Sequence, residues 1–185
     1  MRFFLSAALL LVAATVHAQS TVRLPATTVR LSAGAGWAGP ASVLDTDRHT
    51  GPSLALGVEH TLAPNLRGLA ELTHWEGSGS NATFATASVE LFPVVGTDAY
   101  VRAGFGYGSA SLHAPIIAVS GDSYSVSGPA IQIGGGYDYR ASDAWTVGMF
   151  ALGTNTISGN AKSKVHHGSG EAALVALGIS LTWHP

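Results

Sequence analysis

Apolar and polar residues alternate one by one along most of this chain, and this period of two limits the folds that the chain can adopt. In segment 131–140 the odd positions are mainly Ile and Tyr, whereas the even positions carry Gln132, Asp138 and Arg140 among glycines. Successive side chains of a β-strand point to opposite faces of the sheet. The pattern therefore predicts strands with one apolar and one polar face.

Eight segments show this alternation, and residues typical of turns separate them. The predicted strands are 28–37, 53–62, 65–75, 82–92, 98–110, 125–140, 143–155 and 168–183. Their connections alternate in length: 63–65, 93–98 and 140–143 are short, 38–52, 112–124 and 156–167 are long, and 76–81 is the shortest on the long side. Antiparallel strands joined in this way place all the tight turns at one end, as in outer-membrane barrels.

The composition removes several classes of protein. Charged residues make up 11% of the chain, against about 25% in ordinary soluble domains. A net charge of −2 without a basic run argues against nucleic-acid binding. The chain has no Cys, which excludes a disulfide scaffold and a lipid-modified N-terminal Cys.

The N-terminus predicts export from the cytoplasm. Arg2 precedes the apolar run FFLSAALLLVAAT, and VHA ends at Ala18 as a small-residue cleavage site. We therefore expect residues 1–18 to be a signal peptide and residues 19–185 to form one outer-membrane β-barrel domain.

Charged residues of the strands fall on the polar face, opposite the apolar one. The alternation predicts a network of ion pairs in the lumen, built from Arg30, Glu59, Arg67, Glu71, Glu90, Arg102, Asp138 and Arg140. On a lipid-facing wall an Arg would cost about 2–4 kcal/mol at the bilayer midplane, whereas inside a barrel the charges can pair. The fold class predicted is all-β, an eight-stranded antiparallel up-and-down transmembrane β-barrel. The alternative is a solvated sheet in a soluble protein.

Large aromatic side chains support the membrane interpretation. Two groups are predicted to lie at the membrane interfaces: Tyr137, Tyr139, Trp145 and Trp183 at the turn end, and Trp37 and Trp75 at the loop end. Two such girdles flank the apolar band of a membrane barrel.

Segments DAYVRAGFGYG and IGGGYDYRASDAWTVGM, with LGVEHTLAPNLRGLAELTHW, resemble the small eight-stranded outer-membrane barrels of the OmpA/OmpX type. The resemblance spans roughly 28–183 and implies a fold that hosts adhesins, membrane anchors and a few enzymes. That family usually ends on an aromatic residue, whereas His184 and Pro185 follow Trp183 here. This departure bears on how efficiently the chain is inserted.

One cluster has a catalytic composition. His167, Ser169 and Glu171 are spaced to share one face of a strand. The His-x-Ser pair resembles outer-membrane lipid A deacylases, with Ser as nucleophile and His as base. Asn follows the Ser in that family, but Gly170 does here, and neighbours two apart on a strand are separated by about 6.6 Å. A polar loop rim is the interpretation adopted.

No metal or cofactor is expected. His49, His113, His166 and His167 fall in loops at one end together with Asp45, Asp47 and Asp122, but no spacing among them is diagnostic of a metal site.

The sequence therefore predicts a non-enzymatic integral protein of the bacterial outer membrane. Its role would be structural or surface-interacting and adhesion-like, with a closed polar lumen and no open pore, because eight strands leave an interior just filled by side chains. The expected partners are outer-membrane lipid and lipopolysaccharide, the barrel-assembly machinery, and a surface partner bound through loops 38–52, 112–124 and 156–167. Two alternatives remain open: a lipid A-modifying hydrolase using His167 and Ser169, and a soluble periplasmic barrel that binds an apolar ligand inside.

Overall fold

A computed structural model describes residues 27–40, 49–93, 98–113, 123–157, 159–162 and 167–185. The predicted signal peptide, residues 1–18, lies outside the described residues. The part of the chain that the structure describes contains no helix with the length and apolar character needed to cross a membrane.

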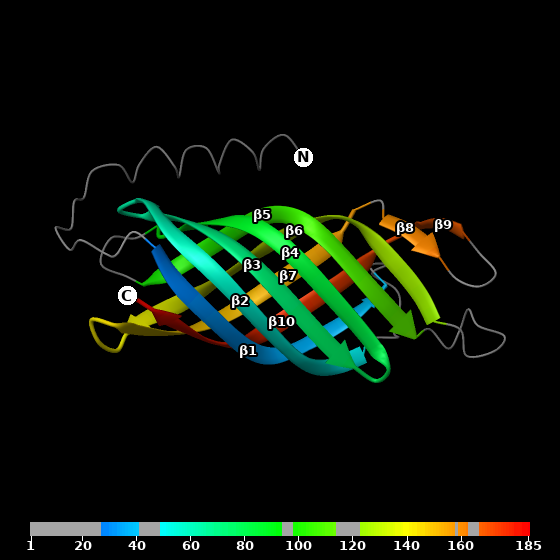
Figure 1. Ribbon diagram of the computed structural model, residues 1–185, viewed down its shortest axis with the longest axis horizontal. Coiled ribbons are helices and arrows are strands. Elements are labelled where there is room, and N and C mark those ends of the chain that lie inside the picture. The colour runs from blue at the N-terminus through cyan, green and yellow to red at the C-terminus, as the bar shows by residue number, and fades with distance from the viewer. Residues whose placement is uncertain (1–26, 41–48, 94–97, 114–122, 158, 163–166) are drawn as a thin grey trace.

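Eight long strands form a closed antiparallel barrel (Figure 1), so the predicted fold class is confirmed. They are β1 (Thr27–Pro40), β2 (His49–Ala63), β3 (Leu66–Gly77), β4 (Ser80–Leu91), β5 (Ala99–His113), β6 (Ser123–Arg140), β7 (Trp145–Thr156) and β10 (Ala172–Trp183). Each strand pairs with its neighbours in the chain order, and β1 pairs with β10 to close the ring. Closure leaves none of these eight strands as an open sheet edge.

Two short strands add a hairpin outside the ring, β8 (Gly159–Lys162) and β9 (His167–Gly170). β8 pairs with the first residues of β6, and β9 pairs with β8. The final predicted strand, 168–183, is therefore divided at Glu171, and the predicted loop 156–167 contains a strand. The remaining long strands also run past their predicted limits at this end, because Gly-, Ser- and Thr-rich residues pair there without an apolar alternation to mark them.

Apart from the two-residue turn at Ser78 and Gly79, which replaces the predicted connection 76–81, tight turns and longer connections lie at opposite ends of the barrel, as the sequence predicts. Residues 64–65 and 141–144 connect strands at one end, where β1 begins and β10 finishes. At the other end Ser78 and Gly79 join β3 to β4 with positive φ angles of 51° and 77°. Two residues with positive φ suit the right-handed twist of a hairpin. Because the ring has an even number of strands, its first strand begins and its last strand finishes at the same end, the turn end.

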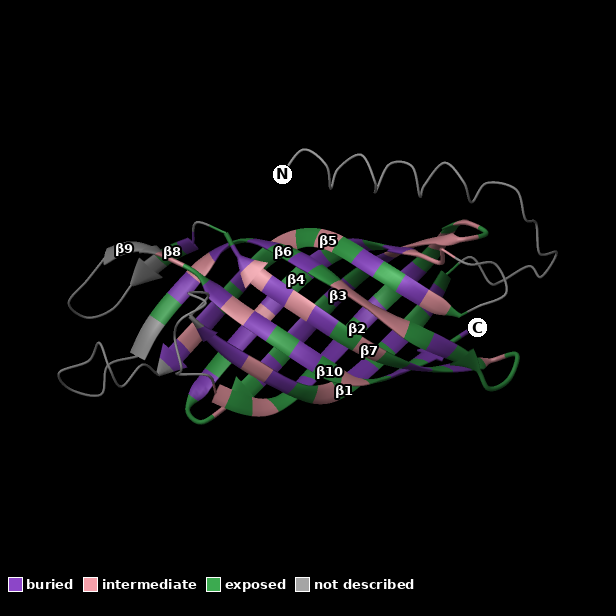
Figure 2. Cartoon of the chain, turned by 180° about the vertical axis from the view of Figure 1, so that it is seen from behind, coloured by how far each residue is buried: buried purple, intermediate pink, exposed green. Residues whose placement is uncertain are grey.

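The outer wall is apolar across its middle. Every long strand carries exposed large apolar side chains, and exposed and buried positions alternate along the strands (Figure 2). Among charged residues whose burial is described, the exposed ones lie at strand ends or in turns: Glu76, Asp98, Arg140, Asp143 and Glu171. A barrel that held an apolar ligand inside would need the reverse arrangement of its two faces.

Candidate functional site

The lumen is filled by an ion-pair network in the half of the barrel near the tight turns. Arg30 on β1 is 1% exposed and contacts acids from three other strands. Its guanidinium lies against Glu59, 2.7 Å from Glu90 Oε1 and 3.0 Å from Asp138 Oδ2. Because each partner comes from a different strand, Arg30 connects β1 with β2, β4 and β6 through the lumen.

Arg102 on β5 is a second centre of the network. Its Nη2 lies 2.6 Å from Glu90 Oε1, and its Nη1 lies 3.2 Å from Glu71 Oε1. Thr73 donates a further hydrogen bond to Glu71 at 3.3 Å. Glu90 therefore lies between two guanidinium groups, and buried charges of opposite sign are paired as their burial requires.

Arg67 on β3 completes the set near the turn end. Its Nη1 lies 3.2 Å from Asp138 Oδ2, and its guanidinium carbon lies 4.4 Å from the centre of the Phe92 ring. The Tyr100 ring lies between the other two guanidinium groups, with its centre 5.5 Å from Arg30 and 5.8 Å from Arg102. Aromatic faces of this kind stabilise cations within about 6 Å.

Seven of the eight predicted lumen charges are thus brought together, and Arg140 is the exception. Arg140 is the last residue of β6 and is exposed, and its Nη2 lies 3.5 Å from Asp143 Oδ1 in the following turn. The prediction for Arg140 is corrected for a simple reason: its strand ends before its side chain can enter the lumen. The connected charges are three arginines and four carboxylates.

Little space remains inside this half of the barrel. A cavity lined by Ser32, Thr73, Arg102 and neighbouring residues has a volume of about 10 Å³. A cavity needs roughly 10–15 Å³ to hold one water. This cavity is therefore no larger than one water molecule.

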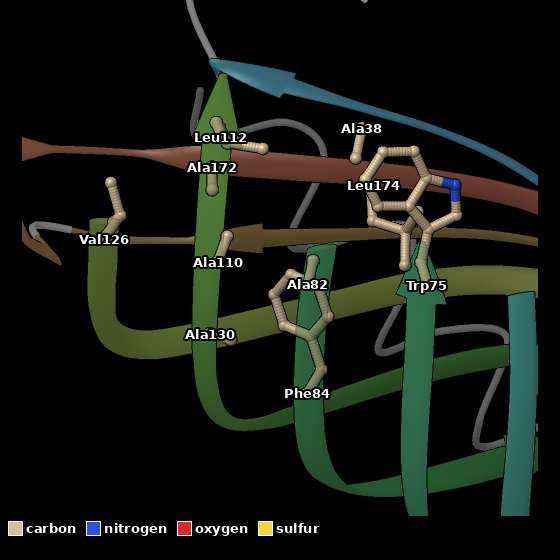
Figure 3. Close-up of a cluster of buried hydrophobic side chains, with 10 residues drawn as sticks. All are labelled: Ala38, Trp75, Ala82, Phe84, Ala110, Leu112, Val126, Ala130, Ala172 and Leu174. Carbon is tan, nitrogen blue, oxygen red and sulfur yellow. The ribbon is translucent and has the colours of Figure 1, made fainter. Parts of the chain in front are cut away.

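The loop-side half of the interior contains an apolar cluster that the sequence does not predict. Trp75 and Phe84 are both 0% exposed and lie among Leu112, Val126 and Leu174 with five alanines, as Figure 3 shows. Trp75 also donates a hydrogen bond to the carbonyl of Gly36 at 3.1 Å. We call this set of ten residues the apolar plug: Ala38, Trp75, Ala82, Phe84, Ala110, Leu112, Val126, Ala130, Ala172 and Leu174.

The plug corrects the prediction that Trp75 lies at a membrane interface. Trp75 shares its face of β3 with Glu71 and Thr73, so its side chain enters the barrel. The alternation itself contains this information, because Trp75 is an even number of residues from Glu71.

The other predicted interface aromatics lie on the outer wall or at its rim. Tyr137, Tyr139, Trp145 and Trp183 are 44%, 63%, 41% and 44% exposed and belong to the turn end of β6, β7 and β10. Trp37 is half-buried near the loop end of β1. The four aromatic side chains of the turn end therefore lie on three neighbouring strands.

Of the residues considered for catalysis, His167 and Ser169 belong to β9, where they pair with Lys162 and Asn160 of β8. Glu171 is exposed and lies between β9 and β10, so the three residues do not share one continuous strand. The prediction that the three side chains share one face of a strand is therefore wrong, because β9 ends at Gly170, before Glu171.

The residues considered for metal binding are only partly within the described part. Asp45, Asp47, Asp122 and His166 lie outside it, and within it no group of three or more His, Asp or Glu side chains is placed to hold an ion. His49 and His113 belong to the loop ends of β2 and β5.

No protein-family model and no curated protein matches the sequence. Among solved structures, Neisserial surface protein A is similar with a TM-score of 0.65 and 11% identity, over 86% of this chain and 97% of that one. Ail of Yersinia pestis has a TM-score of 0.48 and 12% identity over 84% and 97% of the two chains. The N-terminal barrel domain of OprF from Pseudomonas aeruginosa has a TM-score of 0.46 and 12% identity over 86% and 99%. The chain therefore has the small eight-stranded barrel fold that its sequence resembles.

Proposed function

We propose that this protein is a non-enzymatic integral barrel of the bacterial outer membrane, with a structural or surface-interaction role. One observation carries the proposal: the wall exposes an apolar band while the charges of the strands are buried together inside. A water-facing wall would bury its apolar side chains, and large exposed apolar areas mark membrane or protein contact sites.

The interior supports a closed barrel. The ion-pair network occupies the turn-side half, and the apolar plug occupies the loop-side half. Ions crossing the barrel would have to displace fixed charges and then enter a packed apolar layer without hydration. We therefore expect no stable ion conductance.

The loop end supports a surface-interaction role. β5, β6, β8 and β9 continue beyond the ring and carry the loops toward the side opposite the termini. In an outer-membrane barrel that side faces the exterior. Residues 38–52, 112–124 and 156–167 are the segments through which we expect a partner to bind.

Electrophoretic mobility with and without heating tests the membrane barrel. The mature chain is isolated from outer membranes in detergent and run unboiled and boiled. A closed membrane barrel gives a fast unboiled band that slows on boiling, whereas one unchanged band from protein released as soluble material contradicts the proposal.

A further inference from the structure

The outer wall has a shallow, open depression across β2, β3, β4 and β5. This groove has a volume of about 690 Å³, and it is lined by Leu56, Val58, Leu72, Phe105 and Tyr107, by smaller residues between them, and by Glu71. These four strands follow one another in the sheet (Figure 1), so the groove belongs to a single continuous stretch of wall. We call it the wall groove.

The strand register explains why the wall is hollow there. Ala85 on β4 pairs with Leu72 on β3 and with Tyr107 on β5. Ala87, two residues along, pairs with Ala70 and Phe105. Alanines therefore form the floor, which is one strand wide at Ala85 and two strands wide at Ala70 and Ala87, with large side chains on either side.

A fixed polar pair lies at the loop-side end of the wall groove. His74 and Thr83 are the next outward-facing residues after Leu72 and Ala85, and they are partners in the β3–β4 register. His74 Nδ1 lies 2.8 Å from Thr83 Oγ1, which fixes the orientation of the imidazole on the outer wall. The wall groove therefore has an apolar length and a hydrogen-bonding end.

We propose that the wall groove binds one acyl chain of a membrane lipid, with the lipid head group at His74 and Thr83. The inference rests on the proposed membrane location. It deepens that location by assigning a particular place on the wall where a lipid is retained rather than exchanged freely.

The shape of the molecule favours a lipid over a second copy of this chain. A second barrel would present a wall of many strands, which is much wider than a floor that spans one strand at Ala85 and two at Ala70 and Ala87. A flexible chain of methylene groups can follow such a floor and contact both sides. The wall groove is also continuous with the apolar band, and the order from apolar floor to polar pair matches that of an amphiphile standing in a leaflet.

The test is native mass spectrometry of the full mature chain in detergent micelles containing dimyristoylphosphatidylglycerol. Ala85→Phe fills the floor. Ala151→Phe is the matched control, because Ala151 is also an exposed, outward-facing alanine, on β7. His74→Ala removes the hydrogen-bonding end and leaves the floor intact.

We expect the wild type and the control to retain one lipid per barrel, Ala85→Phe to lose it, and His74→Ala to retain less. Equal retention by all variants, or a dimer that Ala85→Phe abolishes, would overturn the wall groove as a lipid site. Heat-shifted mobility, measured on each variant, separates the two proposals: a wild type without the shift overturns the membrane location as well, whereas a normal shift with equal retention overturns the lipid site alone.

Discussion

Arg30 on β1 and Glu90 on β4 meet across the interior of the barrel, with 2.7 Å between Nη1 and Oε1. Two strands, β2 and β3, lie between them in the wall. The contact is therefore a brace through the lumen that backbone pairing between neighbouring strands does not supply.

Arg30→Ala should lower the stability of the barrel strongly, because it leaves Glu59, Glu90 and Asp138 buried with fewer cations. Removing one partner of a buried ion pair costs about 3–5 kcal/mol. Arg140→Ala is the control, since its pair with Asp143 is exposed and such pairs contribute about 0–1 kcal/mol. Urea denaturation of protein refolded in lipid vesicles gives both midpoints, and equal midpoints would contradict the bracing role of Arg30.

Gly148→Ala should also destabilise the barrel. A methyl group at Gly148 on β7 would press against Asp138 Oδ1 and Ser180 Oγ, both of which are buried in the lumen. Overpacking of this kind costs about 1–3 kcal/mol. Gly153→Ala on the same strand serves as the control, because the nearest atom, the Ile133 carbonyl oxygen, would be 3.7 Å away. A shift in the unfolding midpoint for Gly153→Ala as large as that for Gly148→Ala would rule out this explanation.

Trp75→Ala should open a cavity in the apolar plug. Substitutions of a buried Trp or Phe by Ala cost about 3–5 kcal/mol in packed interiors. Tyr139→Ala, at a position 63% exposed on the outer wall, should cost less. Unfolding midpoints of the two variants test this difference in stability.

Planar-bilayer recordings test whether the apolar plug also blocks ion flow. If Trp75→Ala conducts ions and the wild type does not, the plug contributes to closing the lumen.

The stability of the barrel should depend on pH through His184, which follows β10 at the turn end. Burial lowers the pKa of its imidazole, and the nearby Arg140 and Arg67 lower it further. The folded chain therefore holds His184 neutral, 2.8 Å from the Thr146 hydroxyl. The unfolded chain binds the proton more readily, so stability is full above about pH 6.5 and falls as the pH drops below this value toward the folded pKa.

His184→Gln should remove that part of the pH dependence. The measurement is the unfolding midpoint between pH 7.5 and pH 5, with the pH values chosen around the usual pKa of about 6.5. A wild type and a variant with the same slope over this interval would show that another group is responsible.

Ser169→Ala should leave the acylation of lipid A unchanged in cells that express the protein. Ser169 lies on a short strand that ends before Glu171, which does not favour a hydrolytic triad. Mass spectrometry of extracted lipid A compares the wild type, the variant and cells without the protein. If lipid A loses an acyl chain in cells with the wild type but not in cells with Ser169→Ala, the non-enzymatic proposal is wrong.

The alternation was enough to predict which side chains face the lumen and which face outward, because a period of two assigns each side chain to one face. It therefore placed Arg30 and Glu90 inside and Leu31 and Val89 outside. The alternation could not predict how far along the barrel axis each side chain lies. Arg140 follows the inward alternation, yet its strand ends at the rim, and the plug around Trp75 depends on how residues from eight strands pack at one level. β8 carries little alternation over four residues, so its existence follows from pairing with β6.

The closure of the ring by β1 and β10 has a consequence for how the chain enters a membrane. Arg30 is on the first strand, but its acids come from β2, β4 and β6, and β10 supplies the hydroxyl of Thr182 at 3.3 Å. A partly assembled sheet that moved into hydrocarbon would carry this guanidinium without all its partners, at a cost of several kcal/mol. Spontaneous, strand-by-strand insertion is thus penalised by the same residue that stabilises the finished barrel. Burial of the first strand is therefore favourable only once β6, which carries the last of these three acids, is in place.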